Sequence, residues 1–233
     1  MKTYDFIQTI IHNLMLKSFF LNDIGLLHGK IGIALFFYNY SKFTDNTVYS
    51  DYADDLLDDI WNSLHNRLPD TFESGLTGIA WGIEYLIQNN FVLGNSNEIC
   101  EEIDNRIMQL DPFRMFPKFA EKELEGFLHY VLIRILGTIR QQSEPPFDKL
   151  YRNNLFQVFS FLQQQDKINE TCRTLINQYF NFINYKQPFD YKPDLLQLID
   201  ENKIIEKYYL SAPLGLKNGI AGQLYKKIIG IAK

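Results

Sequence analysis

A Gly-x-x-Gly motif occurs three times in this chain, and each copy opens a segment of bulky apolar residues. The copies begin at Gly29, Gly75 and Gly219. A weaker copy begins at Gly126 and has His129 in place of the second glycine. The first two copies are 46 residues apart, a distance typical of repeats built from helical hairpins. The motif therefore predicts a helical-repeat fold.

The segments between the motifs predict a second kind of helix. Between the first two copies, apolar residues recur at i, i+3, i+4, i+7 and i+11, with aspartates in most other positions: Ala53, Leu56, Leu57, Ile60 and Leu64. This pattern is typical of a helix with one buried stripe and a solvated face. The segments that follow Gly29 and Gly75 are instead apolar nearly all round, as in a helix buried on every side. We therefore expect an all-α fold, an α/α toroid in which inner helices are wrapped by outer helices.

The glycines are expected to serve the sharp turn at the start of each inner helix. A residue without Cβ tolerates close backbone approach or a positive φ. Gly78 and Gly82, four residues apart, would also let a neighbouring helix pack closely. Further helices are predicted over residues 4–20, 147–165 and 168–185, and no long linker interrupts the chain. We expect a single domain over residues 1–233.

Composition and charge exclude several classes of partner. A net charge of −5 and a pI near 5.4 argue against nucleic acid or an anionic membrane as partner, because phosphate binding needs a basic surface. No stretch of about 18 apolar residues occurs, so no membrane span is predicted. The two cysteines, Cys100 and Cys172, are predicted to be free thiols in a reducing compartment. The start of the chain does not resemble a signal peptide, so a cytoplasmic location is expected.

Three stretches resemble the inner-helix signatures of the lanthionine synthetase C-like (LanC-like) family: GLLHGKIGIALFFYNY, FESGLTGIAWGIEYLIQNNF and LGLKNGIAGQLY. The resemblance is clearest over residues 25–110 and 214–224. It implies an α/α toroid, which in that family usually has seven helical hairpins. At 46 residues per hairpin this chain has room for about five, so fewer than seven are expected. The resemblance also implies a role in the modification or maturation of a ribosomally synthesised peptide.

The cyclases of that family hold a catalytic zinc with a Cys and a later Cys-His pair. Zinc lowers the pKa of the substrate thiol, and the thiolate adds to a dehydroalanine or dehydrobutyrine. Here neither Cys100 nor Cys172 is followed by His. We therefore expect no metal site and no cofactor, and a non-catalytic or accessory role. The partners implied are a precursor peptide or a peptide-modification enzyme.

Self-association or docking is expected through residues 140–195, which are rich in aromatic residues: Phe147, Tyr151, Phe156, Phe159, Phe161, Tyr179, Phe180 and Phe182. The alternative is that these rings fill the core of the chain.

Polar residues on or just before the inner helices are the candidates for lining a cavity: His28, Lys30, Glu73, Trp81, Glu84, Glu125 and His129. Each has a structural alternative. His28 and Lys30 would be solvated loop residues, and Glu73 would be an anion at a helix N-terminus. Glu84 either lines the cavity or is paired internally, and His129 is either a ligand or a hydrogen-bonded core residue.

Two other functions remain open from the sequence. A carbohydrate-active α/α barrel would use two carboxylates as acid and base, and Glu73, Glu84 and Glu125 could supply them. A helical scaffold would instead bind another protein through an open edge.

Overall fold

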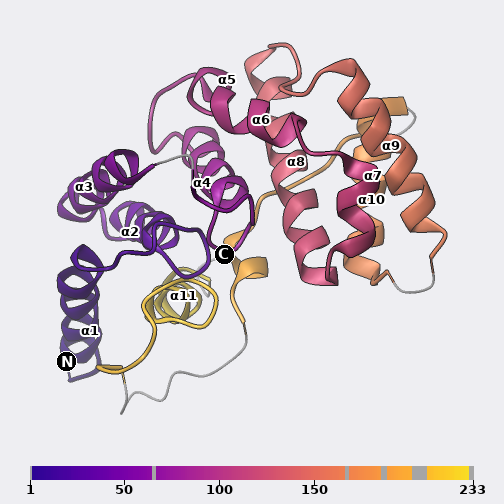
Figure 1. The fold of residues 1–233 in the computed structure, drawn as a ribbon. Helices are drawn as coiled ribbons and strands as arrows, with labels where there is room; N and C mark the ends of the chain where they lie inside the picture. The colour runs from indigo at the N-terminus through magenta and orange to yellow at the C-terminus, as the bar shows by residue number, and fades with distance from the viewer. Residues whose placement is uncertain (1, 65–66, 166–167, 185–187, 201–208, 231–233) are drawn as a thin grey trace. The chain divides into compact units, whose positions relative to one another are not determined.

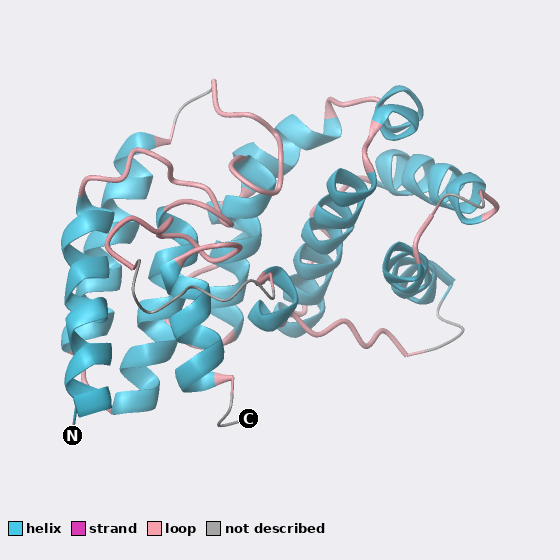
Figure 2. Ribbon diagram, turned by 90° about the horizontal axis from the view of Figure 1, so that it is seen from below, coloured by secondary structure: helices cyan, strands magenta, loops and turns pink. Residues whose placement is uncertain are grey.

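The computed structural model describes residues 2–64, 67–165, 168–184, 188–200 and 209–230, and their regular structure is entirely helical (Figure 2). The predicted all-α class is thereby confirmed. The longer helices are labelled in Figure 1: α1 (Lys2–Phe19), α2 (Lys30–Thr44), α3 (Val48–Ser63), α4 (Leu76–Gln88), α8 (Glu121–Gln141), α9 (Lys149–Gln163) and α10 (Glu170–Asn184). The shorter elements are α5 (Ser96–Ile99), α6 (Glu101–Met108), α7 (Pro112–Met115), α11 (Ile220–Leu224), two 3-10 turns (Phe116–Lys118 and Leu195–Leu198) and a π-helical turn (Tyr225–Ile229). None of the helices in these ranges is long and apolar enough to cross a membrane.

The chain divides into two compact units. Unit 1 comprises Met1–Pro69, Glu73–Gly82 and Asp194–Lys233, and unit 2 comprises Asp70–Phe72 and Ile83–Pro193. Helix α4 contributes its first half to unit 1 and its second half to unit 2. A single domain over residues 1–233 stays a prediction.

Helix α2 is the inner helix of unit 1. It packs against α3, α11 and the π-helical turn, and every residue from Lys30 to Tyr38 is buried. The first half of α4 also lies against it, because a Cβ built on Gly82 would be only 2.5 Å from Ile31 Cγ2. The predicted close packing at Gly82 is confirmed. Helix α3 keeps one buried stripe and an exposed acidic face, as predicted for an outer helix.

The three Gly-x-x-Gly copies open their helices through equivalent loops. In each loop the first backbone N–H of the helix donates, over 2.9 Å, to the carbonyl seven residues earlier: Lys30 to Asp23, Leu76 to Pro69 and Ile220 to Pro213. Gly29 and Gly219 are the N-cap residues of α2 and α11, and neither helix has a side-chain cap. The loop carbonyls therefore satisfy N–H groups that a capping side chain would otherwise take. The predicted starts of the inner helices are confirmed.

Close backbone approach explains these glycines. None of the glycines that the structure describes has a positive φ. A Cβ on Gly29 would lie 2.6 Å from the carbonyl oxygen of Asp23, and one on Gly219 would lie 2.5 Å from the backbone nitrogen of Gly215. Both distances are shorter than real Cβ contacts allow. The sequence left close approach and positive φ open, and the structure shows that close approach applies.

Helix α8 is the inner helix of unit 2. Its residues from Gly126 to Thr138 are all buried, and it packs against α10. The weak fourth copy of the motif does not open this helix. The helix begins at Glu121, where the Glu123 carboxylate accepts the Ala120 N–H at 2.9 Å. Gly126 lies in the second turn, and a Cβ there would be 2.5 Å from Cβ of Phe72.

The aromatic residues of unit 2 mostly fill its core. Among the eight rings considered for docking, five are buried: Phe147, Tyr151, Phe159, Tyr179 and Phe182. Phe156 and Phe180 are half-buried, and Phe161 is 58% exposed. A partner role for this region would therefore depend chiefly on Phe161.

Candidate functional site

The three loops that open the inner helices of unit 1 meet at equivalent residues. We call residues 23–29, 73–75 and 213–219 the loop cluster. Leu27, Glu73 and Lys217 each lie three residues before the first residue of their helix. The Lys217 N–H donates to the Leu27 carbonyl at 3.0 Å, and the Leu27 N–H donates to the Glu73 carbonyl at 2.9 Å. The loops are thus joined in a row by their backbones.

The loop cluster also carries charge. The Lys217 ammonium pairs with the Glu73 carboxylate. The Lys217 side chain is 14% exposed and that of Glu73 is 47% exposed, so the pair opens toward solvent on the Glu73 side. His28, next to Leu27, is exposed. The hydrogen-bonded loops therefore carry a cation, a carboxylate and an imidazole.

Two other predicted residues of unit 1 have structural roles. Lys30 is buried in the first turn of α2, where its ammonium pairs with Asp59 of α3 and donates to the Phe19 carbonyl at 3.3 Å. Trp81 is 1% exposed in the core. Neither side chain is therefore available to a ligand.

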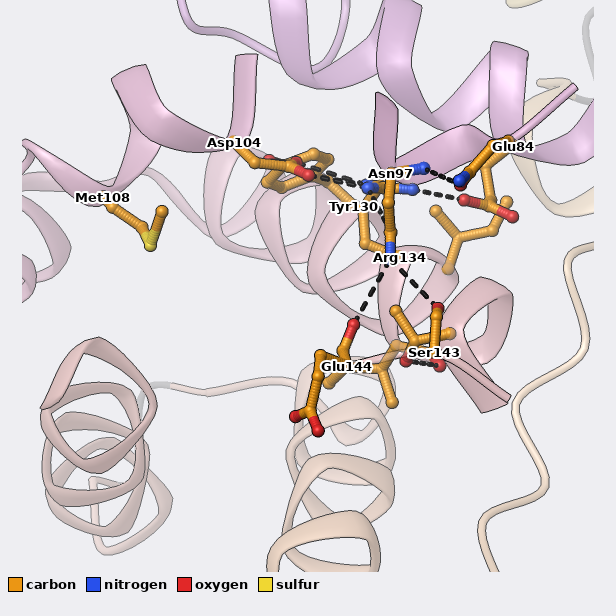
Figure 3. Close-up of polar contacts among 12 residues, drawn as sticks. Glu84, Asn97, Asp104, Met108, Tyr130, Arg134, Ser143 and Glu144 are labelled. Atoms are coloured by element: carbon orange, nitrogen blue, oxygen red, sulfur yellow. Dashed lines mark hydrogen bonds and ion pairs between the residues drawn. The ribbon is translucent and has the colours of Figure 1, made fainter. Parts of the chain in front are cut away.

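Glu84 belongs to a buried ionic network in unit 2, which Figure 3 shows centred on Arg134 of α8. Arg134 donates to Glu84 through Nη1 and to Asp104 of α6 through Nη2, at 2.6 Å, and Nε, at 3.1 Å. The side chains of Arg134 and Glu84 have no exposed surface, and that of Asp104 is 4% exposed. Glu84 is therefore paired internally.

Further hydrogen bonds hold the carboxylates of this network. The Tyr130 hydroxyl donates to Asp104 at 2.5 Å, and the Gln88 amide donates to Glu84 at 3.0 Å. Burial raises the pKa of the Asp104 carboxyl, although the hydrogen bond and charge of Arg134 oppose that shift. The network holds two carboxylates against one guanidinium, and it ties together α4, α6 and α8.

Asn97 connects the buried network by hydrogen bonds to the loop that follows α8. Its side-chain oxygen accepts from Arg134 at 3.0 Å, and its amide donates to Ser143 Oγ at 3.0 Å and to the Glu144 carbonyl at 3.3 Å (Figure 3). The core members present no group to solvent, so the network fixes the position of elements and does not contact a ligand.

His129 is a hydrogen-bonded core residue. Its Nδ1 lies 2.9 Å from the Tyr191 hydroxyl, and its Nε2 lies 4.0 Å from Glu125 Oε1. The ring stacks on Phe72 with a centroid separation of 6.0 Å. Burial lowers the pKa of His129 to about 4, so the imidazole is neutral near pH 7. The structure thus brings Glu125 and His129 together, but in a packed environment.

Each carboxylate considered for acid and base catalysis lies beside another side chain. Glu84 has no exposed surface and cannot reach a glycosidic oxygen. Glu73 is paired with Lys217 in unit 1, whereas Glu125 lies beside His129 in unit 2. No observation favours the carbohydrate-active alternative.

Sequence reasoning missed Arg134, Asp104 and Lys217. Arg134 did carry a signal, since it is the single Lys, Arg, Asp or Glu between Gly126 and Ile139. Asp104 carried none, because it stands among several acidic residues. Lys217 could have been found by aligning the loops, where it occupies the position of Glu73.

Comparison with known proteins gives one similarity. The chain matches the model of a protein family described as lanthionine synthetase C-like protein over residues 21–225. This stretch contains all three loops of the loop cluster. No curated protein and no solved structure matches the chain.

Proposed function

Because the chain belongs to the lanthionine synthetase C-like family, we propose that it acts in the modification or maturation of a ribosomally synthesised peptide as a non-catalytic, accessory binding protein. Its fold class is the α/α toroid of that family, with inner helices opened by Gly-x-x-Gly motifs and fewer than seven hairpins. Family membership supports a peptide as the partner. The arrangement of the side chains that could bind zinc supports the accessory role.

The residues present do not fit the zinc of the family's cyclases, and this observation carries the proposal. That zinc needs two thiolates and an imidazole. Cys100 and Cys172 are both fully buried, and burial raises the pKa of each thiol to about 12. Within the described ranges, no three His, Cys, Asp or Glu side chains are grouped so that they could hold a metal. We therefore assign this chain no activation of a substrate thiol by zinc.

The loop cluster supports a binding role. Glu73, Lys217 and His28 offer an acceptor, a donor and an imidazole from loops fixed by backbone hydrogen bonds. Groups on a rigid scaffold lose little entropy when a flexible peptide binds. The same loops need no metal to hold them together, because the Glu73–Lys217 ion pair and the backbone row already join them.

A cytoplasmic location is part of the proposal. Cys100 and Cys172 are free thiols, as expected in a reducing compartment. The chain would then bind its partner before the peptide is exported. That partner is either the precursor peptide itself or a peptide-modification enzyme.

A direct test uses the precursor peptide encoded beside the gene, after dehydration, with a fluorescent label. Anisotropy measures its binding to the purified chain, and alkylation followed by mass spectrometry counts its remaining cysteine thiols. We expect binding without loss of thiols, with or without added zinc. Consumption of thiols that depends on the chain would overturn the accessory role, and absence of binding would overturn the peptide partner.

Two variants locate the binding. Lys217→Met removes the cation of the loop cluster and should weaken peptide binding. Lys192→Met is the matched control, because that side chain is 80% exposed in unit 2. Equal affinities for the two variants would remove the loop cluster from the proposal.

A further inference from the structure

The C-terminal end of α1 and the residue that follows the helix, Phe20, expose three large apolar side chains. Leu16, Phe19 and Phe20 are 69%, 67% and 79% exposed. Their spacing of i, i+3 and i+4 makes them neighbours on a helical surface, and the two phenyl rings meet edge to face with centroids 5.3 Å apart. Exposed apolar residues of unit 2, such as Phe113 and Ile139, stand singly on their helices. Single residues are ordinary on a surface, whereas a contiguous group marks an interaction site.

Helix α1 does not need this face for its own packing. Ile11 and Leu14, on the opposite face, are fully buried in unit 1. The Tyr52 hydroxyl of α3 also donates to the Met15 carbonyl at 2.6 Å and lies 2.7 Å from Ser18 Oγ. Helix α1 thus packs on α3 through the face opposite Leu16 and Phe19. The exposed apolar face is available to a partner.

An acidic helix face adjoins these apolar side chains. Helix α3 contains no Lys or Arg, and four of its aspartates are exposed: Asp51, Asp54, Asp55 and Asp58. Lys30 marks where the two faces meet, since its ammonium pairs with Asp59 of α3 and donates to the Phe19 carbonyl. The end of α1 therefore adjoins α3 on the flank that carries Asp59.

We infer that this α1–α3 face, defined by Leu16, Phe19, Phe20, Asp55 and Asp58, docks a cationic amphipathic segment of the peptide partner. The apolar side chains of the segment would cover the rings, and its Lys or Arg side chains would meet the aspartates. Burial of aromatic residues supplies most of the affinity at such surfaces. Complementary charge selects the partner and sets its orientation.

The charge of α3 disfavours the other occupants of an apolar face. An anionic lipid surface attracts basic segments and would be repelled by the aspartates. A second copy of this chain would bring an equally acidic helix to the contact, and like charges oppose association. The identity of the partner as a peptide rests on the proposed function, whereas the chemistry of the surface rests on the contacts above.

The experiment uses the full chain and two labelled amphipathic peptides, one of Leu and Lys and the other of Leu and Glu. Fluorescence anisotropy should show that the Leu/Lys peptide binds and that the Leu/Glu peptide does not. The double variant Phe19→Ser, Phe20→Ser should weaken binding by about tenfold or more. Asp55→Asn with Asp58→Asn should weaken binding and reduce its dependence on salt.

Matched controls distinguish binding at this face from nonspecific binding. Phe161→Ser removes an exposed ring of α9, and Glu101→Gln with Glu102→Gln removes exposed carboxylates of α6. Both controls should bind the Leu/Lys peptide as the unmodified chain does, and circular dichroism should show that all variants remain folded. Equal loss in the controls, or equal binding of the Leu/Glu peptide, would overturn the inference.

Two further measurements test the other occupants. Light scattering that shows a dimer lost on Phe19→Ser, Phe20→Ser would assign the face to a second copy. Flotation with anionic phosphatidylserine vesicles that depends on Phe19 and Phe20 would assign it to a membrane. Either result overturns the inference.

The natural precursor peptide separates this inference from the proposed function. If the precursor binds equally well to the unmodified chain and to the Phe19→Ser, Phe20→Ser variant, the face is not its docking site, and the proposed function stands. If the Leu/Lys peptide binds as expected and the precursor does not bind at all, the surface chemistry is supported and the proposed function fails.

Discussion

Arg134 of α8 donates to Glu84 of α4 at a point where neither side chain has any exposed surface. The same guanidinium is bound to Asp104 of α6, so one cation holds two buried carboxylates. Breaking a buried ion pair by removing one partner is costly, because the other charge is left in a medium of low polarity. The stability of unit 2 should therefore depend more on the guanidinium than on either carboxylate.

Arg134→Met should lower the free energy of unfolding by about 3–5 kcal/mol, because it leaves both carboxylates without their counter-ion. Glu84→Gln should have a smaller effect, since Arg134 then retains Asp104 as a single partner of opposite charge. Urea denaturation followed by circular dichroism measures both values, with the exposed Arg140→Met as control. If Glu84→Gln lowers the free energy of unfolding as much as Arg134→Met does, the excess of carboxylates over guanidinium does not determine the stability of this network.

Gly137 leaves room for the Glu84 carboxylate. A Cβ at this position would lie 2.5 Å from Glu84 Oε2. Gly137→Ala should therefore destabilise the protein by about 1–3 kcal/mol, although alanine favours a helix. In a Glu84→Ala background the same substitution should cost much less, and a double-mutant cycle by urea denaturation measures that coupling. Gly94→Ala is the control, because its Cβ would meet only the flexible ends of side chains such as Ile99. Equal effects in the two backgrounds would contradict the proposed contact.

Gly82 lets α4 lie against α2 in unit 1. Because its Cβ would be 2.5 Å from Ile31 Cγ2 in a buried position, Gly82→Ala should lower the melting temperature despite the gain in helix propensity. Ile31→Ala should remove part of that penalty in the double variant, although it leaves a cavity of its own. Strictly additive effects would argue against direct contact at this position.

His129 should make the stability of the protein depend on acid pH. Burial lowers its pKa from 6.5 to about 4. As the pH falls below 6.5, His129 becomes protonated in the unfolded chain. In the folded chain it stays neutral until about pH 4. The folded state therefore loses up to about 3 kcal/mol across that range.

The His129→Gln variant isolates this effect. The difference between its free energy of unfolding and that of the unmodified chain, measured by urea denaturation from pH 7 to pH 4, should change with pH. His12→Gln, at an exposed position of α1, controls for the loss of an imidazole. A pH-independent difference for His129→Gln would show that the pKa of His129 is the same in the folded and unfolded chain, and that burial does not lower it.

The sequence predicted those parts of the fold that local pattern determines. The glycine motifs located the starts of α2, α4 and α11. At Gly29 and Gly219 the loop leaves no room for a Cβ, which ties the motif to the start of the helix. The same motif failed at Gly126, where the pattern was incomplete and capping by Glu123 starts α8 earlier. The choice between close approach and positive φ could not be made, since it depends on how the backbone of the preceding loop folds back on each glycine.

The candidate site was harder to predict because its contacts are distant in sequence. Glu84 was recognised as unusual, but its partner Arg134 lies 50 residues away. Glu73 was named without Lys217, which is 144 residues away. Periodicity shows which face of a helix is buried. It does not show which charged side chain of the neighbouring helix or loop contacts that face.

The central claim is that this chain serves peptide maturation by binding and not by zinc-dependent chemistry. Zinc content is its most direct test. Inductively coupled plasma mass spectrometry on the tag-free protein, purified without chelators and then supplied with zinc before desalting, should find far less than one zinc per chain. The Cys100→Ser, Cys172→Ser variant should give the same value. About one zinc per chain, lost in the cysteine variant, would contradict the account.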